Sequence, residues 1–145
     1  MWFALALTAA LCWGLSYALS EHILKTQMTV PVYMLLTSLV STVVSLGLVL
    51  FSANGRQGWT QLVQHPTTAV GPSLNALLYC LGSVLVYSAI QRANATSVGF
   101  VEITYPFFTA LFAFWLFGAV QIGASTLLGG LCIMAGLVLI AQSQT

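Results

Sequence analysis

Apolar residues dominate five long segments of the chain, each near the roughly 20 residues that an α-helix needs to cross the hydrocarbon core of a bilayer. Short polar segments separate them, and the longest of these covers residues 52–68. The fold class that we predict is all-α, a polytopic membrane bundle of five transmembrane helices. Their expected bounds are about Trp2–Leu24, Val30–Ser52, Ala69–Ile90, Thr96–Phe117 and Gly123–Ala141.

The polar segment at residues 52–68 is long enough to contain structure of its own. Asn54-Gly55 is a dipeptide typical of turns. Farther along, three apolar side chains recur at helical spacing among polar ones: Trp59, Leu62 and Val63. We therefore expect a turn at Asn54-Gly55, followed by a short helix that lies at the membrane interface.

Composition agrees with a membrane protein and excludes several other classes. The chain is 59% hydrophobic and 3% charged, whereas soluble proteins carry about 25% charged residues. A formal net charge of +1 leaves no basic face for nucleic acid. The cysteines lie inside apolar segments at neither metal-ligand nor disulfide spacing. We expect the lipid bilayer as a partner, and no nucleic acid, metal or cofactor.

The fourth segment holds a carboxylate and a proline at nearly the same depth. Glu102 lies about 10 Å inside a helix that begins near Thr96, beyond ordinary interfacial solvation. Pro106 has no N–H to donate to the carbonyl of Glu102, so we expect a kink that frees polar backbone beside the carboxyl group. Intramembrane acids often mark function, which favours a site here. The structural alternative is a carboxyl group that is simply kept protonated, or that bonds to Tyr79 or Asn75, and so holds the bundle together.

Polar and aromatic side chains line one face of three segments, the first, third and fourth. In the third they recur every four residues, and lipid would not tolerate such a stripe. It must therefore meet another helix or a hydrated pathway, and both remain open. The candidate substrate-binding residues are Glu102, Trp13, Tyr17, Asn75, Tyr79, Ser83 and Tyr105, with Pro106 as the helix kink.

The fifth segment has a different character, because small residues gather on one face of it. Such faces let helix backbones approach closely in membranes. We expect an assembly surface there, formed by Ser125, Gly129, Cys132 and Gly136.

Five spans place the two ends of the chain on opposite sides of the membrane. We call the N-terminal side A and the other side B. Side A then holds Arg56, and side B holds Lys25 and Arg92. A difference of one basic residue favours side B in the cytoplasm only weakly, so the chain could insert in both orientations. Glu21 and Lys25, at i and i+4, are expected to form an exposed pair.

Five short motifs follow one another along the chain: Trp13-Gly14, Tyr87–Ile90, Ala95–Gly99, Tyr105–Ala113 and Leu128–Ala141. In order and spacing they resemble one EamA repeat of the drug/metabolite transporter superfamily, over nearly all of residues 1–145. The resemblance implies a single five-helix domain, two of which are normally fused in inverted orientation to form a ten-helix carrier. Ala119 departs from the pattern, since the repeat usually has a glutamate there.

The resemblance implies a transporter whose second half comes from another chain. We expect a secondary transporter in the cell (inner) membrane that moves a small organic metabolite or amphipathic compound by alternating access. A second copy in inverted orientation, or a homologous partner chain, would complete it. Glu102 would bind a cationic group or a coupling proton, beside aromatic walls.

Two other hypotheses remain open. The chain could be a subunit of a heteromeric carrier or lipid-linked sugar flippase, or it could be a non-transporting scaffold or regulatory subunit. An enzyme is not expected, because His22 and His65 lie outside the spans and no acid–base pair has catalytic spacing.

Overall fold

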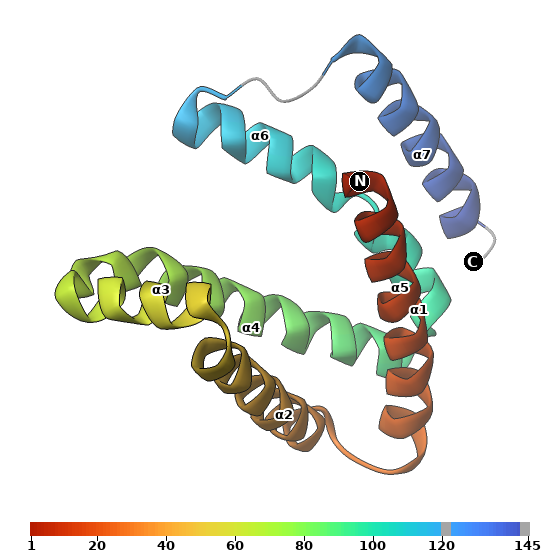
Figure 1. The fold of residues 1–145 in the computed structure, drawn as a ribbon. Coiled ribbons are helices and arrows are strands. Elements are labelled where there is room, and N and C mark those ends of the chain that lie inside the picture. Colours follow the sequence, from red (N-terminus) through yellow and green to blue (C-terminus); the bar gives the residue numbers. More distant parts are fainter. Residues whose placement is uncertain (120–122, 143–145) are drawn as a thin grey trace. The chain divides into compact units, whose positions relative to one another are not determined.

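A computed structural model describes residues 1–119 and 123–142, and within these residues every regular element is a helix (Figure 1). The elements are α1 (Trp2–Thr26), α2 (Val30–Phe51), α3 (Ala53–Gln64), the 3₁₀ helix η1 (Pro66–Ala69), α4 (Val70–Arg92), α5 (Ala95–Glu102), α6 (Tyr105–Phe117) and α7 (Ala124–Gln142). The all-α prediction is confirmed.

Four helical segments of the described chain are long and apolar enough to cross a membrane: Trp2–Thr26, Val30–Phe51, Pro66–Arg92 and Ala95–Phe117. The fifth predicted span corresponds to α7, whose 19 residues extend about 28 Å, close to the hydrocarbon thickness of a bilayer. Large apolar side chains are exposed along all of these segments, as lipid-facing surfaces require. Residues 120–122, in the predicted connection between the last two spans, lie outside the described residues.

One local prediction is wrong. Asn54-Gly55 does not form a turn but belongs to the first turn of α3, which begins at Ala53. The predicted helix Thr96–Phe117 corresponds to the candidate span Ala95–Phe117, which is interrupted between α5 and α6 at Ile103 and Thr104. The short helix expected around Trp59 is present as α3.

The chain divides into two compact units, which are described separately. One consists of Leu19–Arg92, and the other joins Met1–Ala18 to the described residues from Ala93 onward.

In the unit Leu19–Arg92, the buried core lies where α1 ends and α2 begins. Leu24, Val30 and Tyr33 form it. The hydroxyl groups of Ser20 and Tyr33 are hydrogen-bonded at 2.6 Å. Burial without such a bond would carry a desolvation cost. The hydroxyl group of Tyr33 on α2 therefore has a partner inside this core.

The C-terminal end of α4 joins the same region. The Tyr87 ring packs edge-on against Tyr33, with ring centroids 5.0 Å apart. The side-chain amide of Gln91 donates to the Leu24 carbonyl, a C-terminal group of α1, at 3.0 Å. The C-terminal ends of α1 and α4 therefore lie together, as their common assignment to side B requires.

The passage from α2 to α3 is unusually short, with Ser52 as the residue between them. Ser52 caps α3, because its hydroxyl oxygen accepts from the Gly55 amide at 2.9 Å. A Cβ at Gly55 would lie 2.7 Å from both the Leu48 carbonyl oxygen and the Val49 Cα. Glycine is therefore required for the first turn of α3 to pack this closely against α2.

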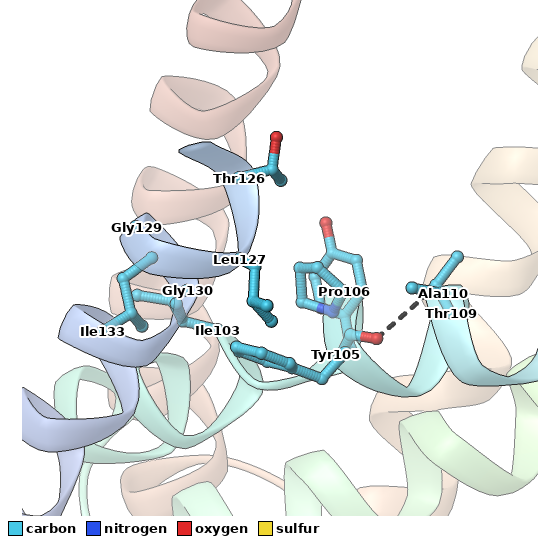
Figure 2. Close-up of a pocket in the computed structure, with 11 residues that line it drawn as sticks. Ile103, Tyr105, Pro106, Thr109, Ala110, Thr126, Leu127, Gly129, Gly130 and Ile133 are labelled. Carbon is cyan, nitrogen blue, oxygen red and sulfur yellow. Dashed lines mark hydrogen bonds between the residues drawn. The ribbon is translucent and has the colours of Figure 1, made fainter. Parts of the chain in front are cut away.

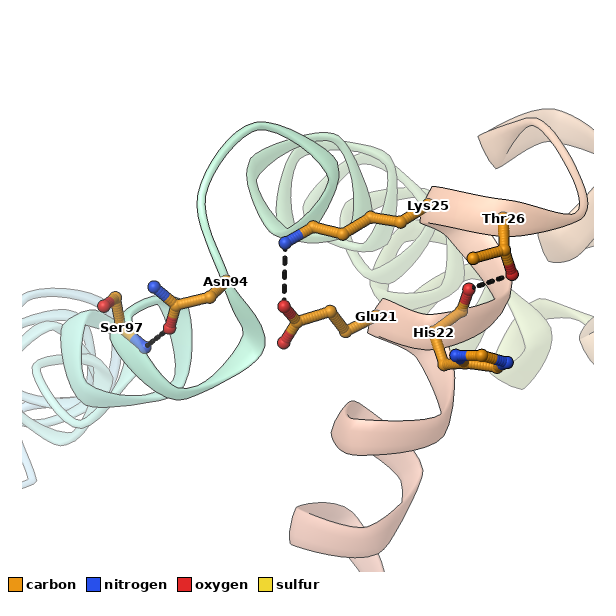
Figure 3. A network of polar contacts seen from close by, with 6 residues as sticks. All are labelled: Glu21, His22, Lys25, Thr26, Asn94 and Ser97. Atoms are coloured by element: carbon orange, nitrogen blue, oxygen red, sulfur yellow. Dashed lines mark hydrogen bonds and ion pairs between the residues drawn. The ribbon is translucent and has the colours of Figure 1, made fainter.

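In the other unit, α5 begins with a side-chain cap. The Asn94 Oδ1 accepts from the Ser97 amide at 2.8 Å (Figure 3). The helix α6 ends at Gly118, whose φ of 64° is the left-handed conformation that glycine adopts without strain. Local capping chemistry thus accounts for both ends of the α5–α6 segment.

Candidate functional site

The strongest polar contact between distant parts of the chain involves Glu102. The Tyr17 hydroxyl on α1 donates to the Glu102 carboxylate Oε2 on α5, and both side chains are half-buried. The two residues are 85 positions apart, within the same unit. The partner of the carboxylate is therefore Tyr17, whereas the structural alternative had named Tyr79 or Asn75.

An aromatic pair extends this contact along α1. The Trp13 ring meets the Tyr17 ring edge-on, with centroids 6.3 Å apart and planes at 82°. Trp13 is 51% exposed, so much of its surface remains available to a ligand or another chain. On α5, Gly99 lies one turn before Glu102 on the same side, and its Cβ position is 3.8 Å from the Tyr17 ring. Trp13, Tyr17 and Glu102 thus form one group.

The carboxylate stands at an interruption of the helix, where Ile103 and Thr104 separate α5 from α6 but keep right-handed helical backbone angles. Glu102 is the last residue of α5, and α6 begins at Tyr105. The Thr104 hydroxyl donates to the Val101 carbonyl at 2.8 Å. The Phe107 amide returns to the Thr104 carbonyl at 3.1 Å, which starts a new helical turn. Pro106 therefore occupies the first turn of α6, where its missing N–H costs least.

The two residues between α5 and α6, Ile103 and Thr104, keep right-handed helical backbone angles, so the kink expected at Pro106 stays a prediction. A proline inside a continuous helix removes one hydrogen bond and pushes its ring against the preceding turn. Ending one helix at Glu102 and starting another at Tyr105 avoids that clash. The acid and the interruption still fall at the same level of the span, as expected.

A pocket of about 590 Å³ opens between α6 and α7 (Figure 2). It is lined mostly by apolar atoms. The Thr109 hydroxyl donates to the Tyr105 carbonyl at 3.0 Å. The lining residues are Ile103, Tyr105, Pro106, Phe107, Thr109, Ala110, Thr126, Leu127, Gly129, Gly130 and Ile133. Tyr105 and Pro106 therefore belong to this pocket, whereas Glu102 bonds to Tyr17.

The polar stripe of the third segment lies on α4, in the unit Leu19–Arg92. Asn75 and Tyr79 are exposed, and Ser83 is half-buried. Only the end of the stripe, Tyr87, packs against an aromatic partner in the described contacts of this unit. The role of Asn75, Tyr79 and Ser83 as substrate-binding residues stays a prediction.

The small-residue face of α7 is mostly exposed, and part of it lines the pocket beside α6. Ser125, Gly129 and Cys132 are exposed and Gly136 is half-buried, while Gly129 lines the pocket. Its neighbour Gly130 faces the Phe107 ring so closely that an added Cβ would lie 2.4 Å from Cζ. Part of the segment expected to serve assembly therefore packs within the subunit.

Sequence reasoning missed Phe107 and the pairing of Tyr17 with Glu102. Gly130, next to the predicted assembly face, was a signal for close approach, but nothing in the sequence names the ring that approaches it. Among the described residues, no group of three His, Cys, Asp or Glu side chains could hold a metal ion.

Comparison with family models gives a match to the EamA-like transporter family over residues 1–142. The chain belongs to this family. Neither the curated proteins nor the solved structures gave a match to it. Members of the EamA-like family are transporters, so this EamA-like chain is a multi-pass membrane protein of the drug/metabolite transporter type. The resemblance found in the five motifs is thereby confirmed.

Proposed function

We propose that this EamA-like protein is a secondary transporter of small organic cations or amphipathic compounds, working by alternating access in the inner membrane. The observation that carries the proposal is the group formed by Trp13, Tyr17 and Glu102 at the break between α5 and α6. The phenol that bonds this carboxyl group carries no positive charge of its own, so a cationic ligand would not have to displace a basic side chain.

The aromatic side chains supply the rest of the recognition chemistry. The exposed part of Trp13 offers a π face to a cationic group, with Tyr17 beside it. The helix interruption after Glu102 lets α5 and α6 change the angle between them, and alternating access needs such a movement. These features favour a cation with an apolar body over an anion.

We further propose that two copies in opposite orientations form the carrier. Each copy would contribute one five-helix repeat and one Glu102. Lys25 and Arg92 on side B against Arg56 on side A leave the charge bias small enough for both orientations. A homologous partner chain could supply the second repeat instead.

Equilibrium binding to the purified protein tests the site. Tetraphenylphosphonium should bind the wild type, and tetraphenylborate, an anion of the same size, should not. Glu102→Gln should lose most of the affinity, whereas Glu21→Gln, at the other acidic side chain of the sequence, should keep it. Equal binding of both ions, or an unaffected Glu102→Gln, would contradict the assignment.

Proteoliposomes test the assembly and the activity. Liposomes that contain the purified protein alone, loaded with a pH-sensitive dye, should report proton movement when an organic cation is added outside. A subunit of a heteromeric carrier would need its partner before any movement appears. A scaffold would move nothing in either preparation.

A further inference from the structure

Helix α3, Ala53–Gln64, takes no part in the proposed site. Its 12 residues extend about 18 Å, too short to cross a membrane. Arg56 and several amide side chains also keep it out of the hydrocarbon. None of its residues is buried. The helix must therefore lie in water or at the membrane surface.

The connections of α3 decide between these two places. Ser52 alone separates it from α2, and His65 alone separates it from η1, which continues into α4 (Figure 1). Both α2 and the stretch Pro66–Arg92 are candidate membrane spans. The two ends of α3 are thus tethered to two candidate spans on side A, which places the helix at that surface.

The apolar side of α3 continues from its contact with α2. Gly55 lies against Leu48 and Val49 of α2. Trp59 and Val63 follow Gly55 at four and eight residues, which places them on the same side of the helix. They are 59% and 65% exposed. These two exposed apolar side chains therefore continue the lipid-facing surface of α2 onto α3.

The side of α3 opposite Trp59 is polar, and the one charged side chain of the helix, Arg56, is engaged with α2. Gln57 lies two residues from Trp59, about 200° around the helix. The Arg56 guanidinium donates to the Leu50 carbonyl at 2.9 Å, so its charge complements the C-terminal end of α2. No cluster of basic residues exists in α3 to attract anionic lipid.

We propose that α3 is a lipid-binding helix that lies in the headgroup region on side A. Trp59 and Val63 insert at the boundary between headgroups and acyl chains, where an indole places its ring in apolar surroundings and its N–H near water. The binding is driven by apolar insertion and not by charge. Zwitterionic lipid is therefore a sufficient partner.

Fluorescence quenching of the full chain in phosphatidylcholine vesicles tests this placement. A variant that retains Trp59 alone, with Trp2, Trp13 and Trp115 changed to Phe, should show blue-shifted emission. Lipids brominated near the headgroup should quench it more strongly than lipids brominated near the chain end. Adding anionic phosphatidylglycerol should leave the quenching unchanged within error. A marked rise with anionic lipid would overturn the charge-independent mechanism.

The matched control moves the indole to the polar side. In the same background, Trp59→Phe combined with Gln57→Trp should give red-shifted emission that is quenched by acrylamide and not by brominated lipid. Equal lipid quenching at both positions would overturn the orientation of α3. Blue-shifted emission at Trp59 without lipid quenching would show that protein covers this face, which also contradicts the proposal.

A spin-label measurement keeps the proposal testable if the tryptophan replacements unfold the chain. With Cys12, Cys80 and Cys132 changed to Ser, a nitroxide can be attached at Val63→Cys or at Gln57→Cys. The label at residue 63 should collide mainly with oxygen, which partitions into lipid. The label at residue 57 should collide mainly with a water-soluble nickel complex. The reverse pattern, or the same pattern at both positions, would overturn the proposal.

Discussion

Glu102 bonds to a neutral partner inside a candidate membrane span, where a carboxylate without a cation carries a large free-energy cost. Among the described residues, Lys25 and Glu21 form an ion pair near the exposed C-terminal end of α1, with 2.7 Å between Nζ and Oε1 (Figure 3). That pair was expected from its i, i+4 spacing and is confirmed. Such an exposed pair contributes little to stability. The other acid, Glu102, bonds to the Tyr17 phenol, and a phenol does not neutralise a carboxylate.

Replacing Glu102 in two ways separates its bonding from its charge. Glu102→Gln keeps an oxygen acceptor for the Tyr17 hydroxyl, so the melting temperature in detergent should change little. Glu102→Ala removes that acceptor and should lower the free energy of unfolding by roughly 1–2 kcal/mol. Both variants should lose cation binding. Thermal melting beside a binding titration checks the pattern, and retained binding in Glu102→Gln would leave the carboxylate a purely structural role.

At the residue scale, the sequence singled out Trp13, Tyr17 and Glu102 as candidates but did not predict the bond between Tyr17 and Glu102. Helical spacing placed Tyr17 and Trp13 on one face, and the depth of Glu102 in an apolar segment singled it out. The bond between Tyr17 and Glu102 joins residues 85 positions apart. Periodicity describes the face of one helix and carries no information on which helix lies opposite.

At the scale of elements, hydrophobic periodicity predicted most helices to within a few residues. It failed where local backbone chemistry decides. Because the Ser52 side chain caps α3, Asn54-Gly55 lies in the first turn of that helix and does not form the expected turn. Pro106 lies in the first turn of α6. The pocket between α6 and α7 could not be predicted, because it depends on how two helices pack.

Two neighbouring glycines on α7 give matched tests of that packing. Gly130→Leu places a side chain where even a Cβ would lie 2.4 Å from the Phe107 ring, so α6 and α7 should separate and the folded protein should melt at a lower temperature. At Gly129 a Cβ meets no described atom within 4 Å. Gly129→Leu should therefore narrow the pocket while the subunit stays folded.

Oligomeric state in detergent distinguishes packing within the subunit from assembly. If the small-residue face also holds two copies together, Gly129→Leu should shift the protein from dimer to monomer at an unchanged melting temperature. Gly136→Leu serves as a second probe of the same face. A protein that keeps its dimer in both variants would show that this face contacts lipid.

At the scale of the whole molecule, the basic residues that should orient the chain are few and partly engaged. Lys25 pairs with Glu21, and Arg56 is bound to the Leu50 carbonyl. Arg92 lies in the last turn of α4, where a cation complements the helix end. Because the Gln91 amide ties α4 to the end of α1, Lys25 and Arg92 share one side of the membrane. The contact between α1 and α4 therefore agrees with the count of two basic residues on side B against one on side A.

Such a small bias can be overturned by design, which makes the antiparallel pair testable. Gln57→Lys with Gln61→Lys adds two positive charges on the polar side of α3, away from Trp59 and Val63. Side A then holds three basic residues against two on side B, so the bias should reverse and favour side A in the cytoplasm. A carrier that needs both orientations should lose activity. The control, Gln57→Glu with Gln61→Glu, should keep it, because acidic residues contribute little to orientation.

Rescue completes the test. A second copy with Gln27→Lys and Ala93→Lys, both at exposed positions on side B, should insert the opposite way. Neither biased copy should transport alone, whereas co-expression should restore activity because the two orientations are again present. Orientation can be measured by labelling a cysteine at Gln64→Cys, in a variant whose native cysteines are serine, with a membrane-impermeant maleimide. If the unbiased protein labels from one side only, the antiparallel homodimer is wrong, and a partner chain or a parallel assembly must be sought.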